Sequence, residues 1–325
     1  MAISFDLVEG PGFADDASRI LEEAWRPPAL RYSPAYLRWQ LGFPSPAPLP
    51  AAAAFDGTEP VGFAGVTARR LRYRSQRLES GIVSFVGVRP RWWKQGIAAG
   101  LYRLLLGALR ERAIPIVTFG ISGSGGERSL LRAYPEAGFQ VQPLGAYPIY
   151  TCMVRRQDRP SIWEAETGAD AADLAGIVED CALDERVVWS DPSEDQISHC
   201  LRDPRPRSLI LLQNKKTGAR GAAWAVRSEF LTVQGVGHVT TLESIFLPRK
   251  DVEALQVLVK LASTLWTAEG EPSAVISAPS LQGFDPGALR EAGIRRTGAQ
   301  FQGFLCAAGP PEALAGAQST NLEVI

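Results

Sequence analysis

The sequence predicts an α/β protein built from two tandem domains, and three observations lead to that prediction. The chain has 325 residues, 46% hydrophobic and 21% charged, so it can bury more than one domain's core. Strand-type and helix-type hydrophobic periodicities alternate along it. The order of elements in the first half returns in the second, beyond a polar, linker-like segment at residues 155–160 that ends in proline.

The first half starts with a helix and a strand pair and continues with a strand, a long helix and another strand. The strand pair turns at Asp56-Gly57, a dipeptide typical of tight hairpins. A strand, a crossover helix and a second strand form a right-handed unit with the helix packed on the sheet. The expected ranges are 13–25 (helix), 52–55, 61–67 and 81–88 (strands), 97–108 (helix) and 113–119 (strand).

The second half shows the same order of elements. Its expected ranges are 208–213, 222–227 and 238–246 (strands), 255–265 (helix), 273–277 (strand), a short helix around Leu289 and a closing strand at 300–305. The last segment is small and polar, which is typical of a flexible tail. We therefore expect a first domain at residues 1–157, a second at 158–309 and a tail at 310–325.

Composition restricts the function classes. The formal net charge is −1, so no global field attracts nucleic acid or an anionic membrane. No apolar run approaches the ~20 residues of a membrane-spanning helix and no signal-type core precedes the first elements, so a cytoplasmic protein is expected. The four cysteines are scattered, and His199 beside Cys200 has no further ligands at zinc-site spacing. Reduced thiols and no metal site are therefore expected.

One stretch combines a strand end, a turn and a helix start in a way that suits a diphosphate. It occupies residues 88–101 and reads VRPRWWKQGIAAGL. Small residues at 96, 98 and 99 let an anion approach the backbone, while the amides of the first helical turn and the helix dipole favour negative charge. Lys94 adds a mobile positive charge. A purely structural strand-to-helix turn looks similar, so this motif alone is ambiguous.

The stretch resembles the pyrophosphate loop of the GNAT superfamily, written V-x-P-x-x-[QR]-x-x-G-x-[GA]. The matching positions are Val88, Pro90, Gly96 and Ala98. Trp93 departs from the pattern, because the family usually has glutamine or arginine there, and Lys94 can replace the lost side chain. A second match, YPEAGF at residues 134–139, resembles the family's Y-x-x-x-G-F segment. Residues 1–157 are therefore identified as a GNAT domain.

The resemblance implies a mixed, mostly antiparallel sheet flanked by helices in each domain. It implies acyl-coenzyme A as co-substrate, with acetyl-CoA as first candidate, and no metal. Strand 81–88 would splay from its neighbour, and its amides near Val86 and Val88 would pair with the pantetheine arm as an added strand does. The implied cofactor-binding residues are Val86, Gly87, Val88, Lys94, Gln95, Gly96, Ile97, Ala98 and Ala99.

The resemblance also implies direct acyl transfer. An amine or hydroxyl attacks the thioester, a backbone amide near Val86 stabilises the oxyanion, and Tyr134 protonates the departing thiolate. Tyr134 can equally be a packed residue at a helix end. The strand lacks the glutamate that often serves as base in the family. Glu79, just before the strand, is the provisional base, although a solvated hairpin charge, a water chain or a group of the second domain are the alternatives.

A basic run follows the first strand pair. Its members are Arg69, Arg70, Arg72, Arg74 and Arg77. Leu71 and Tyr73 alternate with these arginines as in a half-buried strand. The run is either a solvated strand face or a patch for an anionic acceptor or the coenzyme's phosphate. The adjacent Trp92 and Trp93 either cover the nucleotide or fasten the helix to the sheet.

The second half resembles a degenerate GNAT domain. Its strand and helix are joined by LPRKD at residues 247–251, which contains no glycine and cannot make the same anion-binding turn. Gly293-Ile294 is a weak echo of Gly138-Phe139. We therefore expect no working coenzyme site in this half, although it can wall off the acceptor pocket.

Three hypotheses for the function remain. The leading one is an N- or O-acyltransferase that moves an acetyl or related group to a small molecule or saccharide. The second is a non-catalytic acyl-CoA-binding or sensing protein, which the missing strand carboxylate permits. The third is an aminoacyl-tRNA-dependent transferase of the Fem type, which the arginine run suggests and the coenzyme turn opposes. No nucleic-acid or membrane partner is expected from the first two, and no motif encodes the acceptor, the acyl length or the oligomeric state.

Overall fold

The computed structural model describes residues 3–27, 29–152, 161–168, 171–181, 187–247, 251–266, 276–278, 284–308 and 319–321. The first half contains β1 (Ile3–Val8), α1 (Ala14–Ala24), β2 (Ala29–Leu30), α2 (Pro34–Leu41), β3 (Ala51–Asp56), β4 (Glu59–Tyr73), β5 (Gln76–Val88), α3 (Ile97–Glu111), β6 (Ile116–Ile121), α4 (Gly125–Glu136) and β7 (Gln140–Cys152). The second half contains β8 (Trp163–Thr167), α5 (Ala171–Cys181), β9 (Val187–Ser190), α6 (Glu194–Cys200), β10 (Arg207–Asn214), β11 (Arg220–Thr232), β12 (Gly235–Phe246), α7 (Val252–Thr264), β13 (Ile276–Ala278), α8 (Pro286–Glu291), β14 (Ile294–Ala307) and β15 (Ser319–Asn321).

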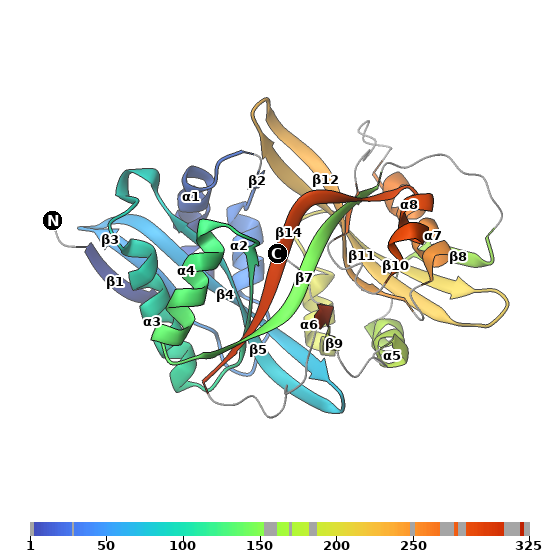
Figure 1. The fold of residues 1–325 in the computed structure, drawn as a ribbon, viewed down its shortest axis with the longest axis horizontal. Helices are drawn as coiled ribbons and strands as arrows, with labels where there is room; N and C mark the ends of the chain where they lie inside the picture. The colour runs from blue at the N-terminus through green and yellow to red at the C-terminus, as the bar shows by residue number, and fades with distance from the viewer. Residues whose placement is uncertain are drawn as a thin grey trace.

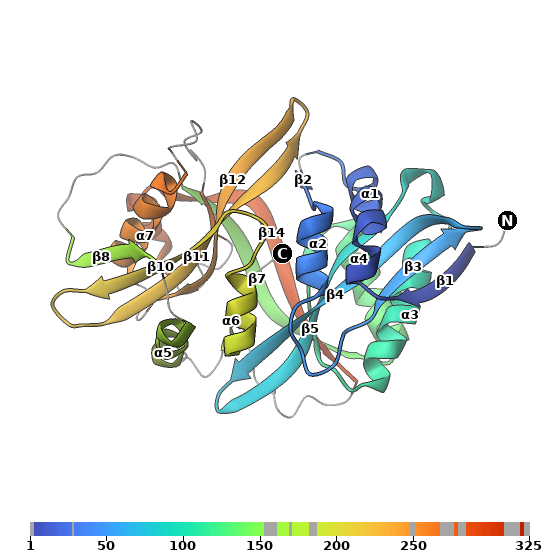
Figure 2. The ribbon, with the colours of Figure 1, turned by 180° about the vertical axis from the view of Figure 1, so that it is seen from behind.

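The strands form one hydrogen-bonded sheet that passes through both halves (Figures 1 and 2). Its order is β1-β3-β4-β5-β6-β14-β7-β13-β12-β11-β10-β8, and along this path the neighbours are antiparallel except for β5–β6 and β12–β13. The fold class predicted from the sequence, two tandem α/β halves with mixed, mostly antiparallel pairing, is confirmed. Most predicted strands are longer than expected, because the β4–β5 and β11–β12 hairpins extend beyond the predicted apolar runs.

The closing strand of the second half lies in the sheet of the first half. β14 sits between β6 and β7, with residues 301–306 opposite residues 121–116 and a longer ladder to β7. Figure 1 shows β14 in red running beside β7 in green from one half to the other. The proposed boundary at residue 157 therefore divides the chain into halves without dividing the sheet.

The two halves repeat the same local irregularity. In β5 the register against β4 shifts, and Phe85 has a left-handed φ of 56°. In β12 the register against β11 shifts, and Ser244 has a φ of 45°. Each strand pairs in parallel with its neighbour, β6 or β13, only before this β-bulge among the described residues. The two halves thus share the predicted order of elements and also the same β-bulge at the equivalent strand.

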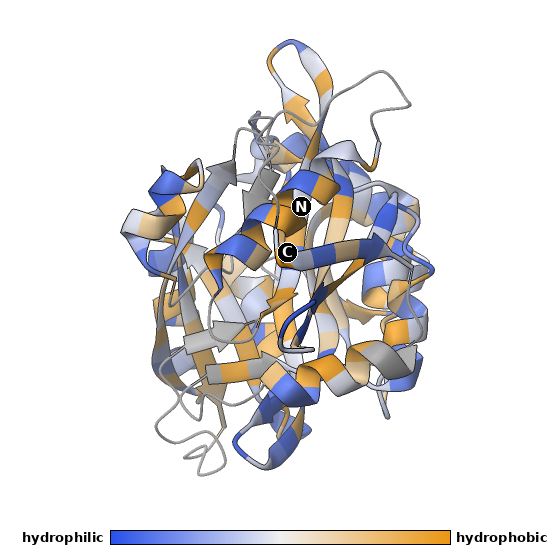
Figure 3. Cartoon of the chain, turned by 90° about the vertical axis from the view of Figure 1, so that its right-hand side faces the viewer, coloured by the Kyte–Doolittle hydropathy of each residue, from blue (hydrophilic) through white to orange (hydrophobic). Residues whose placement is uncertain are grey.

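Helices cover both faces of the first half's sheet. On one face α3 buries the predicted apolar stripe, whose buried members are Ile97, Leu101, Leu105, Leu106 and Leu109. On the other face α1 and α2 bury Ile20 and Leu37 against Phe63 and Phe85. Figure 3 shows orange hydrophobic positions interspersed with blue hydrophilic ones along the helices, as amphipathic packing requires. Each buried side chain of this size contributes roughly 1.5–3 kcal/mol, so β5 is held firmly between two layers.

Part of the C-terminal segment that was expected to be a flexible tail forms a strand. Within the expected tail, Ser319–Asn321 form β15, which pairs in parallel with β9. An exposed strand edge offers backbone partners even to a segment without apolar side chains. The expected linker at residues 155–160 and the rest of the tail lie outside the described residues. No helix in the described part of the chain is long and apolar enough to cross a membrane.

Candidate coenzyme and catalytic site

The parallel ladder between β5 and β6 is short. Residues 81–83 of β5 lie opposite residues 116–118 of β6, and among the described residues the register ends there. β5 then continues through the Phe85 bulge to Val88, while β6 ends at Ile121. The two strands therefore separate over the last part of β5, as the splayed strand expected from the sequence does.

The hydrogen bonds show which groups of β5 face this gap. The Arg89 N–H donates to the Val61 carbonyl at 2.9 Å, which makes Val88 and its opposite residue in β4 a non-hydrogen-bonded pair. The N–H and C=O of Val88 therefore point away from β4, toward the gap. Val86, two residues earlier, has the same orientation. The bulge at Phe85 determines which residues face the gap. Without it, the regular alternation of the ladder would turn Phe85 and Gly87 outward in place of Val86 and Val88.

A sharp turn joins β5 to α3. Residues 90–92 form a single 3₁₀ turn, and Lys94 and Gly96 both have left-handed backbones with φ of 63° and 77°. Gly96 is the N-cap of α3, no side chain caps the helix there, and a Cβ on Gly96 would meet nothing within 4 Å. The first amides of α3 and the positive end of its dipole are thus accessible to an anion. The left-handed conformation costs Lys94 roughly 1–2 kcal/mol.

A cavity of about 300 Å³ opens at this turn. The predicted cofactor-binding residues that line it are Val88, Lys94, Gly96, Ile97, Ala98 and Ala99. Val86 and Gly87 are not among its lining residues. Gly87 packs on α1, where an added Cβ would lie 2.9 Å from Leu21 Cδ2. The Gln95 side chain turns back to the Arg91 carbonyl at 3.5 Å.

The other wall of the cavity comes from α4 and from the next turn of α3. Its polar lining residues that the sequence reasoning missed are Tyr102, Arg103, Ser129, Arg132 and Glu136. Arg103 follows Ala99 by four residues, so helical spacing could have identified it. No comparable signal shows that α4 faces α3. Arg132 pairs with Glu136 at 3.8 Å, so Lys94 and Arg103 give this cavity the net positive lining that suits a polyphosphate.

Tyr134 lies on α4 and is fully buried. Its ring packs near Tyr102 and Phe139, with centroid distances of 6.1 and 5.9 Å. Its hydroxyl has no hydrogen-bond partner among the described residues. Burial raises the pKa of Tyr134 well above its usual value, and Cys306 and Tyr102 raise it further. The Thr118 side chain, close by but outside hydrogen-bond geometry, lowers the pKa. Because Cys306 belongs to β14, the second half contributes to the surroundings of this phenol.

Glu79, the predicted base, does not line the cavity. It is exposed on β5, opposite Arg70 in the hairpin. Seven residues of strand separate it from Val86, which corresponds to ~23 Å at ~3.3 Å per residue. Desolvation raises the pKa of Glu79, and the positive charge of Arg70 lowers it. The structure therefore keeps the predicted base far along β5 from Val86 and from the coenzyme turn.

The basic run on β4 and β5 binds the second half of the chain. Arg70 and Arg77 pair with Asp191 at 3.5 and 2.7 Å, and Arg72 and Arg77 pair with Glu179 at 3.0 and 2.7 Å. Glu179 lies on α5, and Asp191 directly follows β9. These arginines are thus neither a solvated strand face nor a patch for an external anion, because carboxylates of the same chain hold them.

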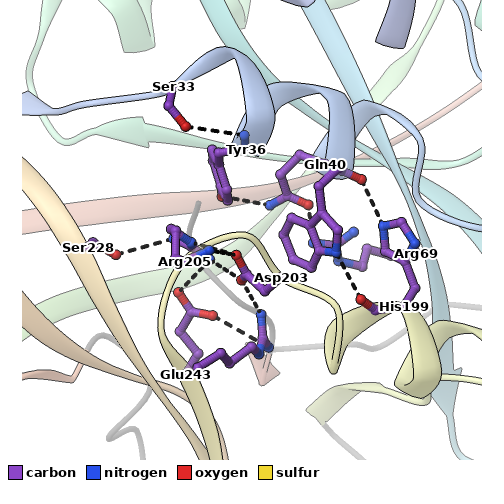
Figure 4. Close-up of polar contacts among 11 residues, drawn as sticks. Ser33, Tyr36, Gln40, Arg69, His199, Asp203, Arg205, Ser228 and Glu243 are labelled. Atoms are coloured by element: carbon purple, nitrogen blue, oxygen red, sulfur yellow. Dashed lines mark hydrogen bonds and ion pairs between the residues drawn. The ribbon is translucent and has the colours of Figure 1, made fainter. Parts of the chain in front are cut away.

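A buried polar cluster fills another part of the contact between the halves (Figure 4). Arg205 and Arg207 share Asp203 at 2.8 and 3.1 Å and approach Glu243 at 4.0 and 3.7 Å. The Arg205 guanidinium also lies 4.1 Å from the centre of the Tyr36 ring on α2. Two cations and two carboxylates compensate each other, so removal of any one would leave a buried charge unpaired. The cluster therefore serves to join the halves.

His199 and Cys200 form part of the same contact. The His199 ring stacks on Trp39 with a centroid distance of 5.2 Å, and its Nε2 lies 2.8 Å from the Trp39 carbonyl oxygen. Burial lowers the pKa of His199. Cys200 is buried. The part of the chain that the structure describes contains no group of three or more side chains that could hold a metal ion.

The second half closes the corresponding helix start with its own side chain. Asp251 is the N-cap of α7, where its carboxylate accepts from the Ala254 N–H at 3.0 Å and from the Trp163 indole N–H at 3.1 Å. In α3 the N-cap position is Gly96, which has no side chain. The carboxylate of Asp251 uses a helix amide and adds negative charge, so this end of α7 repels the anions that the end of α3 attracts.

Residues 14–139 match the acetyltransferase (GNAT) family. This segment contains both the splayed strand and the uncapped start of α3, so the shared features are those that form the candidate coenzyme site. The first half thus contains a GNAT domain. No curated protein sequence matches the chain.

Solved structures with the same fold cover nearly the whole chain. N-myristoyltransferase of Saccharomyces cerevisiae with bound myristoyl-CoA is 9% identical with a TM-score of 0.68, over 99% of this chain and 90% of that one. A tandem GNAT protein from the clavulanic acid biosynthesis pathway is 17% identical with a TM-score of 0.61, over 96% and 100%. Eis1 from Mycobacterium abscessus is 18% identical with a TM-score of 0.50, over 96% and 76%. These likenesses show a tandem GNAT architecture.

Proposed function

We propose that the protein is an acyl-CoA-dependent N- or O-acyltransferase whose first half binds the coenzyme at residues 86–99. The observation that carries the proposal is the uncapped start of α3, which opens into the 300 Å³ cavity lined by Val88 at the end of β5. A diphosphate there would accept hydrogen bonds from the amides after Gly96, with Lys94 and Arg103 adding positive charge. The extended arm of the coenzyme would then lie in the gap between β5 and β6.

The chemistry proposed for this site is direct transfer. The acceptor's amine or hydroxyl attacks the thioester carbonyl, and the C–S bond breaks as the new bond to the acyl carbon forms. The backbone N–H of Val86 faces the gap and would stabilise the oxyanion. Tyr134 would protonate the departing thiolate. Its raised pKa keeps the phenol protonated at neutral pH, and the same burial would raise the basicity of a thiolate beside it.

The acceptor's proton must leave by another route than Glu79, which lies far along β5. We propose that water on the acceptor side takes this proton, or that an acceptor of low pKa has already lost it before the attack. The same distance favours a second candidate function, in which the protein binds acyl-CoA without turnover. The aminoacyl-tRNA-dependent alternative loses its support, because Arg70, Arg72 and Arg77 are paired with carboxylates of the second half.

Acetyl-CoA remains the first candidate for the donor and a small molecule or saccharide for the acceptor. The yeast N-myristoyltransferase was solved with myristoyl-CoA. A long-chain donor should therefore be tested beside the short one. Release of free CoA thiol in the presence of an acceptor separates the transferase from the binding protein, since the latter gives binding without release.

The coenzyme site is tested with a matched pair of substitutions on α3. Ala99→Glu places a carboxylate in the cavity lining, whereas Gly107→Glu places one where an added Cβ meets nothing within 4 Å and outside that lining. We expect Ala99→Glu to weaken CoA binding at least about tenfold by charge repulsion and Gly107→Glu to leave it unchanged. Isothermal titration calorimetry measures both. Equal affinity in the two variants, or no binding by the wild type, would refute the site.

A further inference from the structure

Two tryptophan side chains occupy the outward edge of β5. The Trp93 indole N–H donates to the Val88 carbonyl at 2.6 Å, and the Trp25 indole N–H donates to the Val86 carbonyl at 3.2 Å. These are the two carbonyls that the β4–β5 hydrogen-bond parity turns toward the gap. Trp25 follows α1, whereas Trp93 lies in the turn before α3. Segments far apart in the sequence thus converge on one strand edge.

The indoles change what this edge offers to a ligand. An added strand needs donors and acceptors from its neighbour in alternation. The amides of Val86 and Val88 can donate, but both of the outward carbonyls already accept a hydrogen bond. The pantetheine arm of a coenzyme A carries amide N–H groups as well as carbonyls. Its N–H groups can pair with β5 only by sharing or displacing an indole.

The two indoles differ in how firmly they are held. Trp25 is partly buried and packs edge-on against Tyr32 at a centroid distance of 5.2 Å. Trp93 is 39% exposed, with the Arg26 guanidinium 5.4 Å from its ring centre. Trp93 is therefore the indole that can move.

We propose that Trp93 is a ligand-displaced cap on the Val88 carbonyl, which a pantetheine arm must remove to pair fully with β5. The inference rests on the proposed coenzyme site and adds a residue that determines its affinity and selectivity. A nucleotide without the arm binds at the α3 end and leaves the cap in place. This gives a role to Trp93, which stands where the family usually has glutamine or arginine. Its indole donates a hydrogen bond to the protein's own backbone instead of contacting the ligand.

The test compares two ligands on three proteins. The ligands are CoA and adenosine 3′,5′-bisphosphate, which lacks the arm and the second phosphate of the diphosphate. The proteins are the wild type, Trp93→Phe and Trp163→Phe. Phenylalanine keeps an aromatic ring and removes the donor. Trp163→Phe removes a comparable indole hydrogen bond, to Asp251 in the second half. We expect Trp93→Phe to bind CoA about fivefold more tightly and the bisphosphate with unchanged affinity, and Trp163→Phe to match the wild type for both.

Tryptophan fluorescence gives an independent readout of displacement. CoA should change the emission of the wild type beyond the change caused by the bisphosphate, and this extra change should vanish in Trp93→Phe and persist in Trp163→Phe. CoA affinity in Trp93→Phe equal to or below that of the wild type overturns the cap, as does an equal gain for both ligands. If the wild type binds neither ligand, the coenzyme site itself is refuted, a result distinct from failure of the cap alone.

Discussion

Tyr134 derives its chemical character from burial. It is a helix residue whose immediate neighbours are Ala133 and Pro135, and its hydroxyl is enclosed and unpartnered among the described residues. An enclosed phenol without a hydrogen-bond partner is costly, by roughly 1–3 kcal/mol, and such a cost is typical of functional groups that await a ligand. The proposed partner is the sulfur of the coenzyme.

Substitution of Tyr134 by phenylalanine should separate this role from packing. We expect kcat to fall about 10²–10³-fold, with CoA affinity unchanged and the free energy of unfolding unchanged or higher, because a buried unpartnered hydroxyl is removed. Since the pKa of Tyr134 is raised, its protonated form persists through pH ~10, and wild-type kcat should show no alkaline loss from this group below that pH. Initial rates of thiol release over pH measure both effects.

Tyr102→Phe is the matched control for this substitution. Tyr102 is a partly buried tyrosine that lines the cavity, whereas Tyr134 is not among its lining residues, and burial raises the pKa of Tyr102 to about 12. Because the proposal assigns the acid role to Tyr134, removal of the Tyr102 hydroxyl should leave kcat within about twofold. Full activity in Tyr134→Phe would show that Tyr134 is a packing residue of the core and not the general acid.

At the scale of elements, two equivalent helices differ in how their N-termini are capped. α3 and α7 each follow a bulged strand, but α3 begins at Gly96 and α7 at Asp251. A side chain of the protein thus caps the start of α7, whereas no side chain caps the start of α3. The absence of glycine from residues 247–251 predicted this difference from the sequence alone, because N-capping depends on contacts within one turn.

Asp251→Ala should destabilise the protein by about 1 kcal/mol, as expected for loss of an N-cap side chain. Asp251→Asn should restore most of that free energy, because asparagine caps as well as aspartate. Urea unfolding of the two variants beside the wild type measures the difference. CoA binding should be the same in all three, and a loss of CoA affinity in Asp251→Ala would instead place a ligand function in the second half.

At the scale of the whole molecule, β14 joins the halves. It supplies ladder partners to both β6 and β7, and Phe304 and Cys306 are part of the first half's core. The arginines of the β4–β5 hairpin and the cluster around Asp203 add contacts between the halves. The first half therefore depends on the last strand of the chain for its sheet.

A fragment of residues 1–157 should fail to fold. Without β14, the ladder edges of β6 and β7 lose their partners and buried apolar surface is exposed. We expect the isolated fragment to be insoluble or to lack a cooperative unfolding transition, and co-expression with residues 158–325 to restore a soluble complex. A monomeric fragment that unfolds cooperatively and binds CoA would show that the halves are independent domains.

The sequence by itself determined the features that depend on neighbours within a few residues. The apolar spacing of α3, the glycine at its start, the hairpin turn at Asp56-Gly57 and the repeated order of elements all follow from local backbone and packing rules. These features also located the coenzyme turn and exposed the family resemblance. The β4–β5 and β11–β12 hairpins were predicted too short because charged and polar residues interrupt the continuous apolar runs beyond the predicted ranges.

The tertiary structure alone decided which distant segments meet. The place of β14 between β6 and β7, the carboxylates that hold Arg70 and Arg77, and the enclosure of Tyr134 each join residues more than ~100 positions apart or on separate elements. No periodicity encodes such pairs, since they follow from how the sheet as a whole satisfies its backbone groups and buries its apolar faces. The outward turn of Val86 and Val88, and the indoles that cover their carbonyls, depend in the same way on one bulge and on the docking of α1.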